Sequence, residues 1–187
     1  MEVTYYGDDS DSYDNKYSGE VVIPSQVIYD SKLYKVTHIG SSAFSECSGL
    51  TSVTIPNSIT TIGGAAFYGC GGLTSFTIPS SVIAIGGGAF DGTAWYDNQP
   101  NGLVYAGKVA YEYKGEMPDN TQITIKNGTL GIADWAFGNR WNLTSISIPN
   151  SVVFIGENAF YYCRGLTSIT IPNSVVSIGT YAFYKCI

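Results

Sequence analysis

A repeat of 23 residues constrains what this chain of 187 residues can fold into more than any other feature of its sequence. The segments LTSVTIPNSITTIGGAAFYGC and LTSISIPNSVVFIGENAFYYC begin at Leu50 and Leu143, and another LTS follows each of them 23 residues later, at Leu73 and Leu166. Four copies keep an Ile-Pro pair and an Ala-Phe pair in the same register, and two degenerate copies complete a series over most of residues 21–187. Self-similarity at such a period is typical of stacked repeats, so the sequence predicts about six coils.

The residue types inside one repeat indicate how a coil is built. An extended segment carries Leu50, Val53 and Ile55 on one side, and Pro56 ends it because proline cannot donate to a β-ladder. The Ile-Gly pair that follows permits a tight corner. We interpret the A-F-x-x-C run as a single helical or 3₁₀ turn that points Phe and Cys inward. One unit cannot bury these side chains alone, and stacked units would share one continuous core.

Composition argues against several functions. Only 13% of the residues are charged, about half the usual share, and the net charge of -6 comes without any Lys/Arg cluster. Binding to a phosphate backbone requires such a cluster, so nucleic acid is not an expected partner. No apolar run reaches the roughly 18 residues that span a bilayer. With one His, four Cys and no catalytic motif, we predict that the chain is not an enzyme and holds no cofactor.

The pattern L-x-x-[IV]-x-I-P-x-S-[IV]-x-x-I-G-x-x-A-F-x-x-C resembles the leucine-rich repeat of the BspA-like family, which occurs on surface proteins of host-associated bacteria and some protists. The resemblance covers about four-fifths of the chain and recurs in register. It implies a right-handed leucine-rich repeat solenoid, export to the cell surface, and adhesion to host proteins or other cells. The family has no catalytic motif, so the resemblance transfers no functional residue to this chain.

Two departures from the repeat complete the expected organisation. Residues 103–105 and 109–113 alternate around Gly107 like a β-hairpin, within an insertion of about one repeat. Residues 3–6 and 19–23 also alternate and are expected to pair as an N-terminal β cap. The predicted fold class is therefore α/β, β-rich, with the cap and the hairpin added to the solenoid. We expect one leucine-rich repeat domain over residues 1–187, consisting of a cap hairpin (1–20), repeats (21–90), the hairpin insertion (91–120) and repeats (121–187).

All three tryptophans lie within or just after the insertion, at positions that the repeat does not explain. Trp135 and Trp141 occupy repeat positions that other copies fill with small or surface residues. One interpretation is that they pack under the hairpin or its loop, in the step made by the irregular coil. The other is an exposed aromatic platform for a sugar ring or a peptide, since Tyr and Trp anchor interfaces. The candidate ligand-binding residues are Trp95, Tyr96, Tyr105, Tyr111, Tyr113, Trp135 and Trp141.

Possible metal ligands are few. Cys47, Cys70, Cys163 and Cys186 occupy one repeat position as two separated pairs, so they cannot converge on one zinc ion. Stacked neighbours fall within disulfide range, and a bridge stays open for an exported chain, but the inward position favours reduced core thiols. His38 is expected to be a surface or semi-buried filler. The acidic residues Asp8, Asp9, Asp11 and Asp14 fit a solvated hairpin tip better than a calcium loop.

The expected function is binding. We predict a non-enzymatic binding or adhesion module of an exported bacterial cell-surface protein, with a host or bacterial surface protein or a glycan as partner. The alternative is a structural spacer with no ligand of its own. Residues 1–7 lack the features of a signal peptide, so the expected extracellular or cell-surface location requires a cleaved one. The last repeat ends without a polar cap, which leaves an edge open to self-association. The outward strand positions are almost uniformly Thr and Ser, so a specific site is expected at the aromatic insertion instead.

Overall fold

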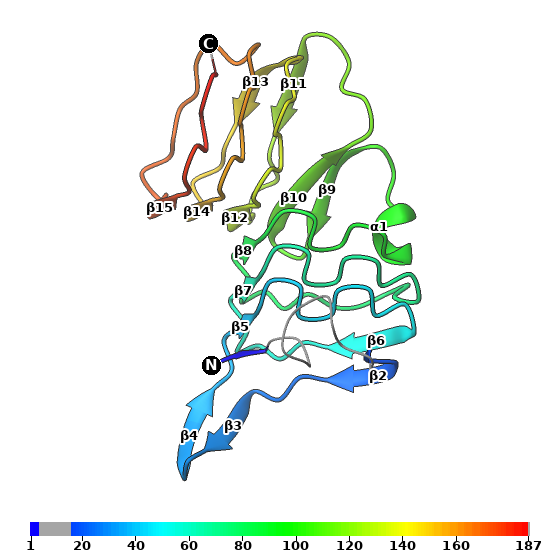
Figure 1. Cartoon of the computed structure of the whole chain (residues 1–187). Helices are drawn as coiled ribbons and strands as arrows, with labels where there is room; N and C mark the ends of the chain where they lie inside the picture. Colours follow the sequence, from blue (N-terminus) through cyan, green and yellow to red (C-terminus); the bar gives the residue numbers. More distant parts are fainter. Residues whose placement is uncertain (4–15, 187) are drawn as a thin grey trace. The chain divides into compact units, whose positions relative to one another are not determined.

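The computed structural model describes residues 1–3 and 16–186, and it divides the chain into two compact units. The first unit comprises Met1–Val82 and Gly86–Gln99, and the second comprises Ile83–Ile85 and Pro100–Ile187. Short strands dominate both units (Figure 1), and α1 (Ala94–Asp97) is the one α-helix in the described residues. The chain is a β-rich leucine-rich repeat solenoid of about six coils with a spacing near 23 residues, as the sequence predicts.

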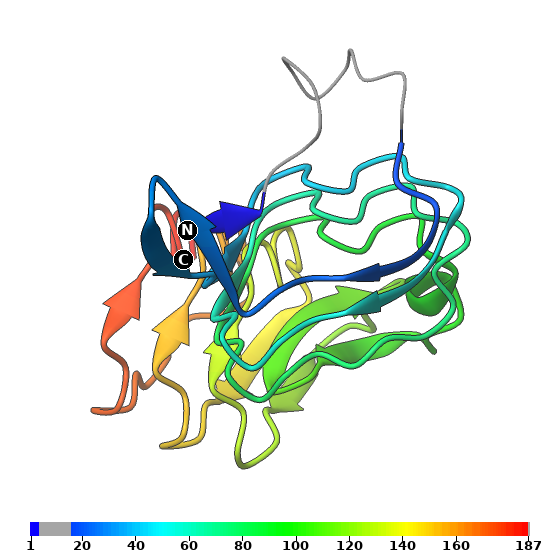
Figure 2. The same ribbon diagram turned by 90° about the horizontal axis from the view of Figure 1, so that it is seen from below.

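The first unit stacks its coils through parallel strand pairs. Strand β5 (His38–Ile39) pairs with β1 (Glu2–Val3) on one side and with β7 (Thr61–Ile62) on the other. A second ladder pairs β2 (Gly19–Val22) with β6 (Leu50–Thr54). Seen from below, successive coils of this unit follow one another as nested loops (Figure 2).

The second unit repeats the scheme with a longer ladder. Its five-stranded sheet has the order β15-β14-β12-β10-β9, and a separate parallel pair joins β11 to β13. The short strand β8 also belongs to this unit. The strand bounds are β8 (Ala84–Ile85), β9 (Gly102–Ala106), β10 (Val109–Lys114), β11 (Thr121–Thr124), β12 (Gly131–Ile132), β13 (Leu143–Ser147), β14 (Phe154–Ile155) and β15 (Ser177–Ile178).

Phenylalanine stacks form the centre of each core. Phe67 lies between Phe44 and Phe90, with ring centroids 5.1 and 5.8 Å apart and nearly parallel planes. In the second unit Phe160 lies in the same way between Phe137 and Phe183, at 5.2 Å from each. Within each unit the repeat therefore stacks three Phe rings of successive coils, and the repeated Ile and Leu positions are buried as well.

The A-F-x-x-C segment is not helical, and the sequence-based prediction of a helical or 3₁₀ turn is wrong. The residue before Ala and the second residue after Phe both have positive φ, as at Trp135 (61°) and Asn139 (60°). Backbone N–H groups at Trp135, Phe137 and Asn139 donate to carbonyls of the next coil at 2.7–3.0 Å. The N–H groups that alternate with them, at Ala136, Gly138 and Arg140, donate to the carbonyl three residues back. Because only every second N–H is available for a local bond, the segment forms separate turns and not a continuous helical turn. We call the six-residue turns at 41–46, 64–69, 87–92, 134–139, 157–162 and 180–185 the turn segments.

The predicted hairpin insertion is confirmed. Strands β9 and β10 pair antiparallel, and Gly107 lies between them with a φ of 61°. Val109 and Ala110 at the start of β10 pair in parallel with Gly131 and Ile132 of β12. The second strand of the hairpin therefore takes the place of a coil strand beside β12 in the five-stranded sheet of the second unit.

The strands that flank the acidic stretch pair differently from the predicted cap hairpin. In the described residues, Val3 pairs with Ile39 of β5, and β2 pairs with β6, each in parallel. Both strands therefore extend repeat ladders instead of pairing with each other. Residues 4–15, which include the four aspartates considered for calcium, lie outside the described residues.

A second hairpin was not predicted. The long first repeat folds residues 26–35 into the antiparallel strands β3 (Gln26–Tyr29) and β4 (Lys32–Lys35), which project from the coils of the first unit (Figure 1). Asp30 and Ser31 between them have φ values of 47° and 58°, as a two-residue type I′ turn requires. The cross-strand partners Ile28 and Leu33 are 76% and 62% exposed, so this hairpin buries little apolar surface.

The described residues contain neither a membrane-spanning helix nor a cluster of metal-binding side chains. Residues 1–3 and 16–186 form no helix with the length and apolar character needed to cross a bilayer. The same residues contain no group of three or more His, Cys, Asp or Glu side chains arranged to hold a metal ion.

Candidate functional site: an aromatic and cationic patch on the turn segments

Five of the seven aromatic residues considered for binding are buried or half-buried. Trp95 lies in the first turn of α1, which Thr93 caps. The centre of its ring is 5.2 Å from the ring centres of both Phe76 and Phe90 in the first unit. Tyr111 and Tyr113 of β10 are buried, at 1% and 8% exposure. Tyr105 is half-buried; its hydroxyl accepts a hydrogen bond from the Lys126 backbone N–H at 3.0 Å, and burial raises its pKa. Tyr96 is half-buried in α1 of the first unit.

The other two, Trp135 and Trp141, face solvent in the second unit. Trp135 is 43% exposed and Trp141 is 70% exposed. The interpretation that they fill a step under the hairpin is therefore wrong for Trp141, whose indole is mostly uncovered. Trp135 is partly covered, but by Tyr161 at a ring distance of 5.2 Å.

Tyr161, the neighbour of Trp135, belongs to a larger cluster of aromatic rings on the turn segments. Tyr161 stacks on Tyr184 of the next coil at 5.4 Å and lies 4.6 Å from Tyr162. Tyr184 in turn meets Tyr181 edge-on at 5.5 Å. We call this surface the turn patch and define it by Trp135, Trp141, Tyr161, Tyr162, Arg164, Tyr181, Tyr184 and Lys185.

Repeat geometry explains why these rings come together. Tyr161 and Tyr184 are equivalent positions of adjacent coils, as are Tyr162 and Lys185. Hydrogen bonds such as Tyr162 N–H to the Tyr184 carbonyl, at 2.8 Å, hold neighbouring turn segments in register. Side chains at equivalent positions are therefore brought within contact distance, and aromatic residues at these positions stack.

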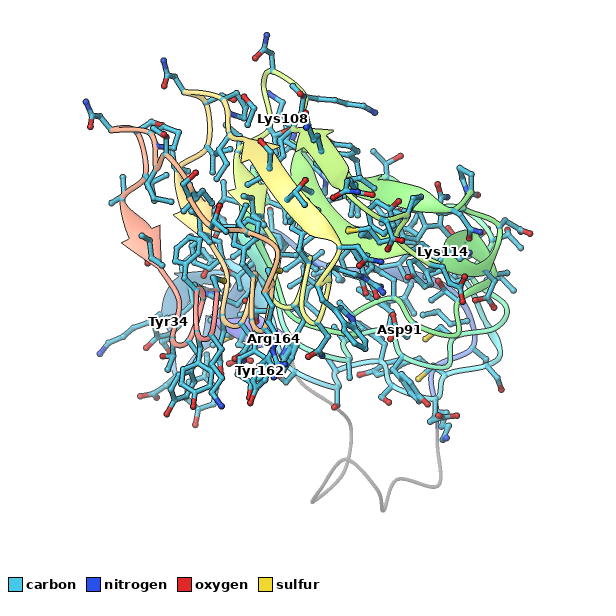
Figure 3. All side chains as sticks on the ribbon, turned by 90° about the horizontal axis from the view of Figure 1, so that it is seen from above. Tyr34, Asp91, Lys108, Lys114, Tyr162 and Arg164 are labelled. Carbon is cyan, nitrogen blue, oxygen red and sulfur yellow. The ribbon has the colours of Figure 1, made fainter. Side chains whose placement is uncertain are left out.

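Two cations surround the ring of Tyr162. The Arg164 guanidinium carbon and the Lys185 Nζ each lie 5.0 Å from the centre of this ring, and Figure 3 shows Tyr162 beside Arg164. Lys185 Nζ also donates a hydrogen bond to the Tyr162 hydroxyl at 3.0 Å. This hydrogen bond, with the positive charges of Lys185 and Arg164, lowers the pKa of Tyr162 from its ordinary value. The same hydrogen bond raises the pKa of Lys185, so the patch carries a positive field on an otherwise acidic chain.

Backbone conformation in the patch is costly for the residues found there. Trp135, Tyr162, Tyr181 and Lys185 all have φ between 56° and 61°, in the left-handed region. Gly or Asn usually fills such positions, as Gly88 and Asn139 do in this chain. Strain of about 1 kcal/mol or more at each site suggests that the side chains themselves are useful there.

Two hollows open beside Trp141. The first, about 280 Å³ in volume, is lined by Asn139, Trp141, Tyr162 and Arg164. The second, about 370 Å³, shares Asn139 and Trp141 with the first and is completed by Glu116, Met117, Arg140 and Asn142. The indole of Trp141 therefore borders both hollows, and a ligand that contacts it can extend into either.

The cysteines and the histidine take no part in this site. Cys47, Cys70 and Cys163 are fully buried free thiols, and Cys186 is a half-buried free thiol. The Cys70 and Cys163 thiols donate to the carbonyls of Phe44 and Phe137 at 3.0 Å. Burial raises the pKa of each of these two thiols to about 12, which makes both unreactive. His38 is exposed, as expected, and its Nδ1 lies 2.7 Å from the Thr37 hydroxyl.

The strand face of the second unit carries another hollow. A hollow of about 350 Å³ on the second unit is lined by hydroxyl residues of adjacent coils, including Ser145, Ser147, Ser168 and Thr170. This face has no charged or aromatic lining residue, so it lacks the groups that anchor interfaces.

Sequence reasoning missed most of the turn patch. Tyr161, Tyr162, Tyr181 and Tyr184 lie within two regular repeats, outside the aromatic insertion that the sequence indicates as the site. The signal was present in the segments AFYYCRG and YAFYKC, which concentrate Tyr beside Arg and Lys at positions where other coils hold residues such as Ser45, Glu46 and Gly69. Recognising it required knowing that the turn segments are held in register, with the buried Ala and Phe inward and the residues after each Phe at the surface.

The stacked coils define a leucine-rich repeat protein. The chain belongs to the family of the BspA type leucine rich repeat region, whose model matches six copies over residues 23–113 and 110–187. The curated proteins include no match to this chain.

Solved structures with similar folds come from several bacteria. A leucine rich cell surface protein from Faecalibacterium prausnitzii is 32% identical over 92% of this chain and 47% of its own, with a TM-score of 0.45. A leucine-rich repeat protein from Bacteroides ovatus is 29% identical over 89% of this chain and 49% of its own, also at 0.45. The leucine rich repeat protein of T. pallidum is 28% identical over 83% of this chain and 59% of its own, with a TM-score of 0.42. This chain spans about half the length of the first two proteins.

Proposed function

We propose that this chain is a non-enzymatic binding module that recognises a partner at a cell surface through the turn patch. The observation that supports this most is the set of exposed Tyr and Trp rings around two cations. Interface cores and hot spots are enriched in Tyr, Trp and Arg, and exposed apolar patches commonly mark binding surfaces. The left-handed backbone at four patch residues adds weight, since smaller residues would fit those positions at lower cost.

The proposed location is outside the cell. The resemblance to BspA-like repeats implies display on a bacterial surface, where a solenoid can present its turn segments to other cells. Partners of this class are a host protein, a bacterial surface protein or a glycan. The low charge of the chain fits recognition through aromatic contacts with a few placed cations.

A direct test compares two versions of the chain on an array of host proteins, bacterial surface proteins and glycans. The wild-type chain is expected to bind a small subset selectively and saturably. The double variant Trp141→Ala, Tyr181→Ala is expected to lose that subset, because truncating an interface aromatic commonly costs about 2 kcal/mol or more. The matched control is Tyr68→Ala, an exposed tyrosine of the first unit, which should leave binding unchanged.

A second candidate function is a structural spacer without a ligand. The uniform Thr and Ser face of the strands favours it, because hydroxyl side chains there serve strand pairing more than recognition. Silence of the wild-type chain across the whole array, with the chain folded, would favour the spacer over the binding module.

A further inference from the structure

The first hollow beside Trp141 has the dimensions and lining of a site for one ring-shaped ligand. Its volume is about 280 Å³, near the lower limit of small-molecule sites. Asn139 and Trp141 line it from one coil, and the equivalent positions of the next coil supply Tyr162 and Arg164. The hydrogen bond from Asn139 N–H to the Tyr161 carbonyl, at 2.7 Å, holds the two coils together at this point. The site is therefore largely preformed.

Trp141 supplies a free aromatic face. It is 70% exposed, and no aromatic ring among residues 1–3 and 16–186 stacks on it. The face of an aromatic ring is electronegative, so it attracts the weakly positive C–H groups on the flat side of a sugar ring. The uncovered surface of this indole is therefore available to a pyranose ring.

Arg164 supplies a cation that is available to an anion. Among the described residues no carboxylate pairs with Arg164, and the recorded ion pair joins Arg140 to Glu112 at 3.9 Å. The Arg164 guanidinium lies 5.0 Å over the Tyr162 ring, which limits its motion but does not neutralise it. Lys185, the second cation that contacts Tyr162, adds to the positive field. Guanidinium groups bind carboxylates through paired hydrogen bonds, so one carboxylate of a ligand fits here.

The second hollow sets a limit on the ligand's charge. Its lining includes the exposed carboxylate of Glu116, and its one cation, Arg140, is already engaged by Glu112 and by the Tyr113 carbonyl. A second negative charge of the ligand in this hollow would be repelled by Glu116, whereas hydroxyl or amide groups can hydrogen-bond to it. This disfavours runs of acidic residues in a peptide and homopolymers of acidic sugars.

We propose, resting on the binding function above, that the hollow between Trp141 and Arg164 binds a single carboxylate-bearing sugar residue next to a neutral sugar. The acidic sugar lies on the Trp141 indole with its carboxylate toward Arg164, and Asn139 contacts its hydroxyls. The neutral sugar occupies the hollow that Glu116 borders. Uronic acids and sialic acids share this chemistry.

Calorimetric titration of the full chain with defined glycans tests the proposal. The probes are a glucuronate–N-acetylglucosamine tetrasaccharide and sialyllactose, which distinguish the two acid types. Each is paired with its carboxyl-reduced, neutral derivative. We expect saturable binding of at least one acidic probe and about tenfold weaker binding of its reduced derivative, with affinity falling as salt rises.

Variants assign the contacts. Trp141→Ala and Arg164→Ala are each expected to weaken binding about tenfold or more, and Arg164→Ala should also abolish the preference for the carboxylate. The matched controls Tyr68→Ala and Lys108→Ala remove an exposed ring and an exposed cation elsewhere and should change nothing. Glu116→Gln should leave the alternating tetrasaccharide bound and improve binding of a tetragalacturonate, which carries an acid on every residue.

Three results would overturn the inference. They are no binding of either acidic probe, equal binding of the reduced derivatives, and tighter binding of a pentaglutamate peptide than of both glycans. The array experiment distinguishes this failure from failure of the binding function. A partner captured through the turn patch without any glycan binding leaves the binding function standing and removes only the acidic-sugar site.

Discussion

Individual residues in the left-handed region report directly on the turn segments. Ala65 has a φ of 52°, and Gly88 holds the equivalent position of the next coil with a φ of 64°. Ala65→Gly removes the clash of Cβ with the backbone but adds freedom to the unfolded chain. We expect a net gain of about 0.5–1 kcal/mol in the free energy of unfolding, measured by urea denaturation at constant m-value.

The neighbouring alanine provides the control. Ala66 is fully buried and does not have a positive φ, so Ala66→Gly should cost about 1 kcal/mol. If both substitutions destabilise the chain equally, the left-handed conformation at Ala65 is not present in solution.

The buried thiols predict how stability depends on pH. The pKa of Cys70 and of Cys163 rises from 9.0 to about 12 in the folded chain because burial disfavours the thiolate. A raised folded-state pKa means that the thiol's contribution is fully present below pH 9 and is lost as pH rises toward 12. The free energy of unfolding under reducing conditions should therefore fall above pH 9, by up to about 1.4 kcal/mol per pH unit for each thiol.

Replacing one of these thiols isolates its contribution. Other groups, tyrosines above all, also titrate in this range, so the informative quantity is the difference between the wild-type chain and Cys70→Ala. The variant should be less stable at pH 7 and should lose less stability between pH 9 and pH 11. If the free energy of unfolding depends on pH in the same way in both proteins, the Cys70 thiol ionises normally and is not buried.

At the scale of elements, the phenylalanine stack carries much of each unit's core. Phe67 is fully buried between Phe44 and Phe90. Phe67→Ala leaves a cavity between two rings and is expected to cost about 3–5 kcal/mol, measured by denaturant unfolding. Tyr68→Ala, at the adjacent exposed position, should stay within about 0.5 kcal/mol of the wild-type chain. If both substitutions lower the free energy of unfolding equally, Phe67 is not the buried residue and Tyr68 not the exposed residue of this turn segment.

Sequence patterns predicted some elements and missed others for physical reasons. The β9–β10 hairpin was predictable because alternation and a Gly turn are local signals. The prediction of helical turns at the turn segments was wrong because every second N–H group there donates to another coil, and no local sequence pattern indicates such partners. The β3–β4 hairpin was missed because both of its faces are exposed, so its residues lack the apolar alternation of a half-buried strand.

For the whole molecule, we propose that residues 1–187 form one domain, because the repeat register continues on both sides of the insertion. The same Ile and Phe positions recur on both sides of the insertion, and solenoids gain stability from each pair of neighbouring coils. We predict one transition in scanning calorimetry, with equal calorimetric and van't Hoff enthalpies. Two resolved transitions would contradict this and would show that the two compact units unfold independently.

The fold was more predictable than the site, and the difference has a clear cause. The fold depends on buried positions that every coil repeats, so six copies of the pattern specify it. The turn patch depends on outward positions where the coils differ. The repeat pattern is defined by the residues that the coils share, so it contains no information about these variable positions. Trp135 and Trp141 departed from the template strongly enough to be noticed, whereas Tyr162 and Arg164 beside them did not.

The central claim is that ligands bind at the turn patch, and the three tryptophans allow one direct measurement. Their indole N–H signals can be followed separately by NMR while a partner selected from the array is added to the ¹⁵N-labelled chain. The account predicts a saturable shift of the Trp141 signal, a smaller one at Trp135, and none at Trp95, which packs on Phe76 and Phe90 in the first unit. A saturable shift at Trp95 with Trp141 unmoved would contradict the account.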